Sequence, residues 1–220
     1  ALPILKANLP VAWAPLVGRR RAVVVLNRGE HTAIYACDAL TDARTMQAGA
    51  VAWQRELLLA NPGPPAESRG RVWLGGARDN EAVIVALTSR GRPVWEKVVP
   101  LEPRSLRLLP FEGGVLVTDA RGAALRLLPD GAVAWVLGAP GDELLSPIDP
   151  ALRRRTLVVP GPLTRLVDPL GGRVLAELPT GPRVLDLKAD ARLNLYLLRE
   201  PGTLETYAPG AALAVVPSAR

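Results

Sequence analysis

The chain has 220 residues, 49% of them hydrophobic, and no apolar stretch approaches the roughly 20 residues that a membrane-spanning helix needs. Its 27 Lys and Arg residues exceed its 21 Asp and Glu residues, but nearly all are arginine, which is typical of a GC-rich genome rather than of selection for a polyanion. The single cysteine, Cys37, excludes an internal disulfide and a cysteine-rich metal site.

In chain order, residues 4–13 supply the last two apolar runs of a unit, and residues 22–26 and 32–36 are predicted strands. A lengthened hairpin over 41–48 returns to a run that contains Trp53. Next come a Pro-rich loop at 61–70 and predicted strands at 71–74 and 81–87.

The following units are more regular. Each has four short β-rich runs separated by Gly, Pro and Asp turns, and Asp-Gly between two such runs is a strong hairpin signal. The predicted strands are 105–109, 115–119, 123–128 and 132–137, then 144–148, 156–159, 163–167 and 173–176, and finally 183–187, 193–198, 203–207 and 211–216.

The motif Gly-Ala-Val-Ala-Trp marks the end of a unit. It occurs at 49–53 and 131–135, with a related sequence at 91–95, and the tryptophans are spaced by 40, 42 and 40 residues. The series continues at Gly171 with Leu175 in place of tryptophan. We expect each tryptophan to lie between neighbouring sheets as a structural staple, with its indole N–H bonded to a backbone carbonyl of the next unit. These residues are Trp13, Trp53, Trp95 and Trp135.

Four strands in about 40 residues are typical of one propeller blade. The sequence therefore predicts an all-β protein, a β-propeller of about five to six four-stranded blades. We expect residues 1–220 to form one domain, and the alternative that they are a fragment of a larger propeller stays open.

The repeat resembles that of pyrroloquinoline-quinone-type (PQQ-like) propellers, in which an Ala-x-Asp sequence leads to Gly-x-x-x-Trp. The best matches are 36–38 leading to Gly49 and Trp53, and 86–88 leading to Gly91 and Trp95. This repeat is shared by enzymes, envelope assembly scaffolds and sensor domains. The quinone enzymes of the family carry adjacent cysteines and a calcium site, and this chain has one cysteine, so the resemblance implies no quinone or other cofactor.

Few residues suit catalysis. His31, the only histidine, lies at a predicted hairpin turn, so a Ser-His-Asp triad or a Cys-His pair would have to use it. Arg107, Asp149 and Asp186 lie in or beside predicted innermost strands, which line the channel of a propeller. We expect them to be channel residues, and predict no catalytic, cofactor-binding or metal-ligating residue.

These features favour a non-catalytic propeller that binds another protein subunit, with the loop at 61–70 as a candidate docking element. The resemblance and the missing initiator Met favour export to the periplasm or cell surface. One alternative is a carbohydrate- or small-molecule-binding or hydrolysing propeller that uses the channel carboxylates. Another is polyanion binding by the arginines at 19–21 and 153–155, although no nucleic-acid partner is expected.

Overall fold

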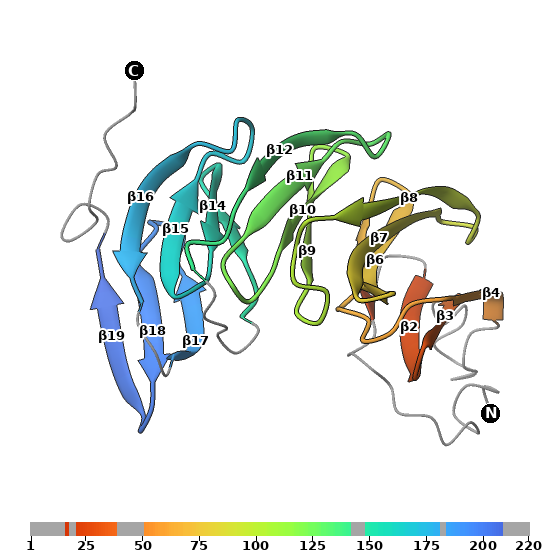
Figure 1. Ribbon diagram of the computed structural model, residues 1–220, viewed down its shortest axis with the longest axis horizontal. Helices are drawn as coiled ribbons and strands as arrows, with labels where there is room; N and C mark the ends of the chain where they lie inside the picture. The colour runs from red at the N-terminus through yellow and green to blue at the C-terminus, as the bar shows by residue number, and fades with distance from the viewer. Residues whose placement is uncertain (1–15, 18–20, 39–50, 142–147, 181–183, 209–220) are drawn as a thin grey trace, which may run out of the picture. The chain divides into compact units, whose positions relative to one another are not determined.

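The computed structural model describes residues 16–17, 21–38, 51–141, 148–180 and 184–208 (Figure 1). All regular secondary structure in these residues is β-strand, which confirms the predicted all-β class. The chain forms two compact units, residues 1–113 and 114–220, and each is described by itself.

The first unit contains two four-stranded antiparallel sheets with the orders β1-β2-β3-β4 and β5-β6-β7-β8, and also the strand β9. The first sheet begins with a strand of only two residues. The strand bounds are β1 Leu16–Val17, β2 Arg21–Arg28, β3 His31–Asp38, β4 Val51–Leu57, β5 Ala66–Ser68, β6 Arg71–Arg78, β7 Glu81–Thr88, β8 Pro93–Val99 and β9 Arg107–Phe111.

The remaining sheets have the orders β12-β11-β10-β9, β13-β14-β15-β16 and β17-β18-β19. A fourth strand predicted at 211–216 for the last sheet lies outside the described residues. The strand bounds are β10 Gly114–Thr118, β11 Ala124–Leu127, β12 Val133–Leu137, β13 Ala151–Arg153, β14 Thr156–Val159, β15 Leu163–Val167, β16 Val174–Pro179, β17 Val184–Ala189, β18 Leu195–Arg199 and β19 Thr203–Tyr207.

In the second, third and fourth sheets, middle strands are buried on both faces. Residues 72–77 of β6 and 82–87 of β7 are all buried, and so are all residues of β10 and β14. Strands covered on both faces read as continuous apolar runs. In the first unit, one core cluster joins β2 and β3 to β6 and β7; in the second, another joins β14–β16 to β17 and β18, so successive sheets pack face to face.

Many of the turns between these strands share one arrangement. A Thr or Asp side chain accepts a hydrogen bond from the backbone N–H two residues later, which is the Asx- or ST-turn. A glycine with positive φ follows in most of them, where a side chain would be strained. The side-chain acceptors and their N–H donors are Thr88 and Arg90, Asp119 and Arg121, Asp168 and Leu170, and Asp190 and Arg192.

One predicted strand was misplaced. The prediction put the first strand of the fourth sheet at 144–148, of which 144–147 lie outside the described residues, whereas that strand is β13, Ala151–Arg153. Arg154 and Arg155 have φ angles of 46° and 61° and form the two-residue hairpin to β14. Such turns usually contain Gly or Asn, so the sequence did not reveal this hairpin.

Candidate functional site

In the first unit, Trp53 of β4 joins its sheet to the next one. Its indole Nε1 donates to the backbone oxygen of Ser89 at 2.8 Å, in the turn between β7 and β8. A Cβ built on Gly91 of the same turn would lie 2.6 Å from the Trp53 ring, so the glycine backbone rests on the indole face. Arg55 adds a hydrogen bond from Nη1 to the Gly91 oxygen at 3.1 Å.

The second unit repeats this contact with Trp135 of β12. Its Nε1 donates to the backbone oxygen of Pro169 at 3.1 Å, and a Cβ on Gly172 would lie 2.7 Å from the ring. Trp95 is half-buried in β8, opposite Ala86, and Trp13 lies outside the described residues. The fifth tryptophan, Trp73, is fully buried in β6 and was not part of the repeat pattern.

The position of the missing tryptophan needs a correction. In β12, Trp135 is paired with Arg126 and Val133 with Leu127, so the residue between them has no partner in the ladder. In β16, Ala176 and Val174 are paired with Leu166 and Val167 in the same way. Ala176, rather than the predicted Leu175, therefore occupies the tryptophan position. The turn before it is one residue longer, because the N–H of Asp168 donates to Arg173 O.

The three predicted channel residues lie in or before the first strands of their sheets. Arg107, in β9, is buried, and its Nη1 donates to the backbone oxygen of Leu106 at 3.1 Å. Asp149 is exposed and precedes β13 by two residues. Asp186, in β17, is half-buried and forms an ion pair with Lys188 at 3.1 Å. Arg107 belongs to the first unit and both aspartates to the second.

β13, which follows Asp149, and β17, which contains Asp186, contact each other. Arg153, the last residue of β13, donates from Nε to the backbone oxygen of Ala189, the last residue of β17, at 3.1 Å. The Asp186 carboxylate also accepts the N–H of Leu187 at 2.8 Å. The Asp186 carboxylate is therefore paired with adjacent residues of its own strand. Its role in a channel stays a prediction.

The Pro-rich segment 61–70 is packed against the first unit rather than free for docking. Pro62, Gly63 and Pro65 are buried, and the N–H of Gly63 donates to Gly75 O at 2.8 Å. A Cβ on Gly63 would lie 2.5 Å from the backbone oxygen of Leu106. β5 lies within the segment, and only Asn61, Arg69 and Gly70 at its ends are exposed, so the prediction that the whole loop is a docking element is wrong.

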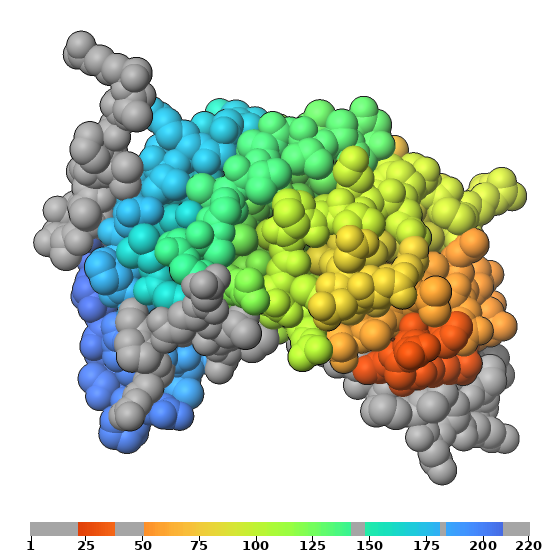
Figure 2. Space-filling view, viewed as in Figure 1, coloured from red at the N-terminus to blue at the C-terminus, as the bar shows by residue number. Residues whose placement is uncertain are grey.

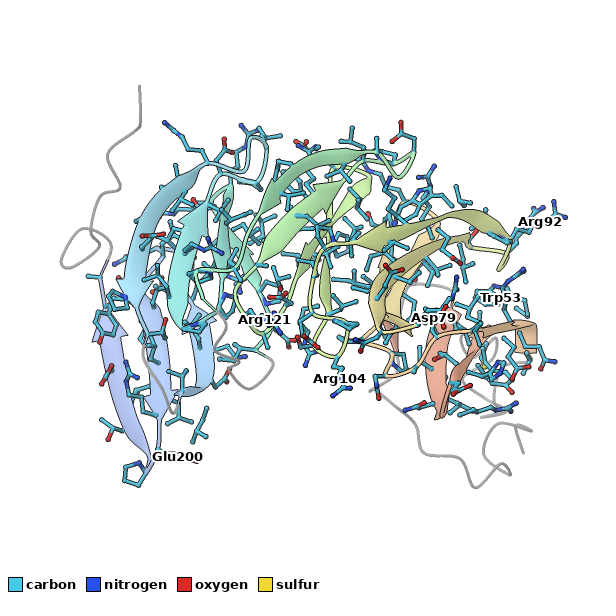
Figure 3. The ribbon with its side chains drawn as sticks, viewed as in Figure 1. Trp53, Asp79, Arg92, Arg104, Arg121 and Glu200 are labelled. Carbon is cyan, nitrogen blue, oxygen red and sulfur yellow. The ribbon has the colours of Figure 1, made fainter. Side chains whose placement is uncertain are left out.

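The first unit contains a cleft of about 370 Å³ that the sequence did not reveal. It lies between the tips of two hairpins, β2–β3 and β6–β7, the segment that follows β4, and the segment before β9. Figure 3 labels Asp79, at the β6–β7 tip, and Arg104, before β9. Its lining residues are Glu30, Leu58, Ala60, Asn61, Ala77, Arg78, Asp79, Asn80 and Arg104.

One of the two cleft arginines is already neutralised. Arg78 forms a two-pronged ion pair with Glu96, with Nη2–Oε2 at 3.0 Å, and its Nε donates to Leu58 O at 2.9 Å. The hydrogen bond from Arg78 to Glu96 raises the pKa of the guanidinium. By contrast, neither Glu30 nor Arg104 has a hydrogen bond or ion pair with any other described residue.

A second polar cluster lies on the last sheet. Glu205 of β19 forms an ion pair with Arg199, with Nε–Oε2 at 2.9 Å, and accepts a hydrogen bond from the Tyr207 hydroxyl at 2.8 Å. Hydrogen bonding, first from Arg199 and then from Tyr207, lowers the pKa of Glu205. Arg199 of β18 and Glu205 of β19 pair across two neighbouring strands, and such cross-strand pairs stabilise a sheet.

This cluster makes a pH-dependent prediction. Because its pKa is lower in the folded state, Glu205 stabilises the protein above its unfolded pKa of about 4.3, and this contribution is lost as the pH falls through the folded value. We expect Glu205→Gln to lower the melting temperature at neutral pH, and the difference from wild type to shrink below about pH 4. Melting curves across this range, with Glu81→Gln as the control for loss of one surface charge, would measure it; a pH-independent difference would contradict the assignment.

Other residues singled out in the sequence lie in structural positions. His31 is exposed as the first residue of β3, and Cys37 is buried in the same strand. In the part of the chain that the structure describes, no three His, Cys, Asp or Glu side chains gather as a metal site would require. These residues also include no helix long and apolar enough to cross a membrane.

No protein-family model matches the chain, and no curated protein matches it. Solved structures do. BamB from Moraxella catarrhalis matches with a TM-score of 0.63 and 17% identity over 91% of this chain and 58% of BamB. The computationally designed Ika8 protein matches with a TM-score of 0.68 and 15% identity over 89% and 57% of the two chains, and the designed Ika4 protein with 0.52 and 16% over 66% and 88%.

These likenesses, together with the repeated sheets, identify the fold as a β-propeller whose blades are the sheets described above. The predicted fold class is therefore confirmed. The chain spans less than two thirds of the length of BamB and of Ika8.

Proposed function

We propose that this chain is a non-catalytic β-propeller of the PQQ-like type that binds another protein in the cell envelope. The observation that carries the proposal is the character of the outermost strands. In β8, Val94 and Val98 are 40% and 51% exposed, and in β12, Val133 and Val136 are 39% and 50% exposed. Each strand lies at one edge of its sheet, and such edges pair readily with another polypeptide.

The hairpin that leads into β8 is accessible as well. The turn that bears Arg92, labelled in Figure 3, projects from the surface of the first unit in Figure 2. The fold likeness to BamB and the resemblance to repeats shared by envelope assembly scaffolds support a protein partner and an envelope location. We propose one domain for the whole chain, with Trp53, Trp95 and Trp135 as staples between its blades and Trp13 as a further one.

Site-specific cross-linking tests this function. A photo-reactive amino acid at Val98 or Val136 is expected to yield a discrete cross-linked product with one partner protein in cells of the source organism. The same amino acid at Asp130, an exposed turn position, serves as the control. Equal labelling from all three positions, or none, would count against a protein interface on the outer strands. Fractionation of the same cells tests the envelope location.

A binding or hydrolytic site for carbohydrates or small molecules is the second candidate. It is supported by the contact between β13 and β17, which brings the strands next to Asp149 and Asp186 side by side. A glycan screen on the wild type and on the Asp149→Asn and Asp186→Asn variants tests it. This candidate requires at least one ligand whose binding or turnover falls about tenfold or more in a variant.

A further inference from the structure

The cleft of the first unit presents unbalanced charge. Arg78 is held by its ion pair with Glu96, and Asp79 acts on that guanidinium only electrostatically. The charged lining side chains with no hydrogen bond to a described residue are therefore two carboxylates, Glu30 and Asp79, and one guanidinium, Arg104. A lining in which two carboxylates accompany one such arginine is a poor site for a simple anion. The charge arrangement instead complements a ligand with a positive group and a negative group a short distance apart.

The floor of the cleft is held in place before any ligand arrives. Ala60 and Ala77 form an isolated bridge in which each N–H donates to the other's carbonyl, at 2.7 and 2.8 Å. A Cβ on Gly76 would lie 2.9 Å from Ala60 O, so the backbones approach closely there. A pre-formed site avoids most of the entropy lost when a loop is ordered on binding.

The walls are hairpin tips whose backbones are fixed by their turns. Asp79 and Asn80 have φ angles of 50° and 64°, and Asn61, which also lines the cleft, has a φ of 46°. These are left-handed conformations that Asn and Asp tolerate best. Glu30 and Arg104 are exposed, without partners among the described residues, and so keep their charges available at the cleft mouth.

We infer that this cleft binds a dipolar peptide segment of the partner protein. A Lys or Arg side chain of the segment lies between Glu30 and Asp79, and a carboxylate of the same segment accepts hydrogen bonds from Arg104. The volume of about 370 Å³ is at the small end of the range for ligand pockets and suits two side chains rather than a folded surface. This inference rests on the proposed function, because it assumes that the ligand is part of a protein.

A titration with short peptides tests it. The probe is the pentapeptide Gly-Arg-Gly-Glu-Gly with acetyl and amide ends, added to the isotope-labelled full chain to about 10 mM, which detects a Kd in the millimolar range. Backbone amide shifts in the two hairpin tips and near Arg104 are expected to change. Peptides with Gln in place of Arg, or Gln in place of Glu, are expected to bind at least about fivefold more weakly.

Variants locate the two charges. The double variant Glu30→Gln, Asp79→Asn is expected to weaken binding of the probe peptide at least about fivefold. The variant Arg104→Gln is expected to bind the probe and the peptide with Gln in place of Glu equally well, because it has lost the group that recognises the carboxylate. Glu67→Gln and Arg90→Gln, which alter charges outside the cleft lining, are the matched controls. Glu30, Asp79, Arg90 and Arg104 are exposed and Glu67 is half-buried, so melting curves are expected to show intact folding.

Equal binding of the peptide that lacks Arg would overturn the inference, and so would shift changes confined to β8 and β12. Absence of any shift change at the highest peptide concentration would overturn it as well. If the peptide does not bind while cross-linking at Val98 identifies a partner, the proposed function is supported and only the assignment of the cleft as a peptide site is contradicted. If the peptide binds as expected and the cross-links fail, the protein interface lies at the cleft rather than on the outer strands.

Discussion

Replacing Gly91 by alanine is expected to lower the free energy of unfolding by about 3 kcal/mol. Gly91 has a φ of 75°, which costs an L-residue about 1 kcal/mol. The new Cβ would also lie 2.6 Å from Cδ2 and Cε3 of Trp53, and displacing that packed ring costs about 2 kcal/mol more. Urea unfolding of the wild type and the variant, followed by tryptophan fluorescence, measures the loss.

Gly70 provides a matched control, because its φ is also 75° and the nearest atom to its Cβ position is Ser89 Oγ at 4.0 Å. Gly70→Ala is therefore expected to lose only the backbone contribution of about 1 kcal/mol. Equal losses at both glycines would show that the contact with Trp53 contributes nothing to stability.

The tryptophan side of the same contact gives a second check. Trp53→Ala removes a half-buried ring and its hydrogen bond to Ser89, with an expected loss of about 3 kcal/mol, at the low end for such truncations. In that background Gly91→Ala is expected to cost no more than Gly70→Ala, so the coupling between the two sites is about 2 kcal/mol. Additive losses would contradict direct packing of the glycine on the indole.

The repeat and most strands could be predicted from the sequence because they depend on local chemistry. Glycine with positive φ and a Thr or Asp that accepts a turn N–H are both visible as residue types at a fixed spacing. The four strands between 105 and 137 were placed within two residues of β9–β12 for this reason. Counting by a period of 40 fails where a turn gains one residue, and so Leu175 was taken for the position that Ala176 holds.

The cleft could not be predicted, because each part of it is an ordinary turn in sequence. Glu30, Asn61, Asp79 and Arg104 belong to four separate connections, and only packing of the two sheets brings them together. The opposite error occurred at 61–70, where a Pro- and Gly-rich composition suggested a free loop. Whether such a segment is exposed depends on the space beside it, here filled by Gly75 and Leu106.

The second unit contains a close approach of two backbones that should tolerate no side chain. A Cβ on Gly161 would lie 2.7 Å from Gly122 Cα and 3.2 Å from its nitrogen, and both are backbone atoms that cannot rotate away. Buried Arg165 donates from Nη2 to the carbonyl oxygens of Gly122 and, at 2.7 Å, of Gly138. Burial lowers the pKa of this guanidinium, although Glu177 and Asp119 act against the shift.

We expect Gly161→Ala to destabilise the protein by about 2–3 kcal/mol, because the new methyl group pushes the Gly122 turn away and weakens the Arg165 hydrogen bonds with it. Gly141→Ala is the control, because nothing lies within 4 Å of a Cβ at that exposed position. Alanine there is expected to be neutral or slightly stabilising, since it reduces the entropy of the unfolded chain. The two variants are compared by urea unfolding and by amide hydrogen exchange of Gly122. A Gly161→Ala protein with wild-type stability and unchanged protection at Gly122 would mean that the two backbones are further apart than the structure places them.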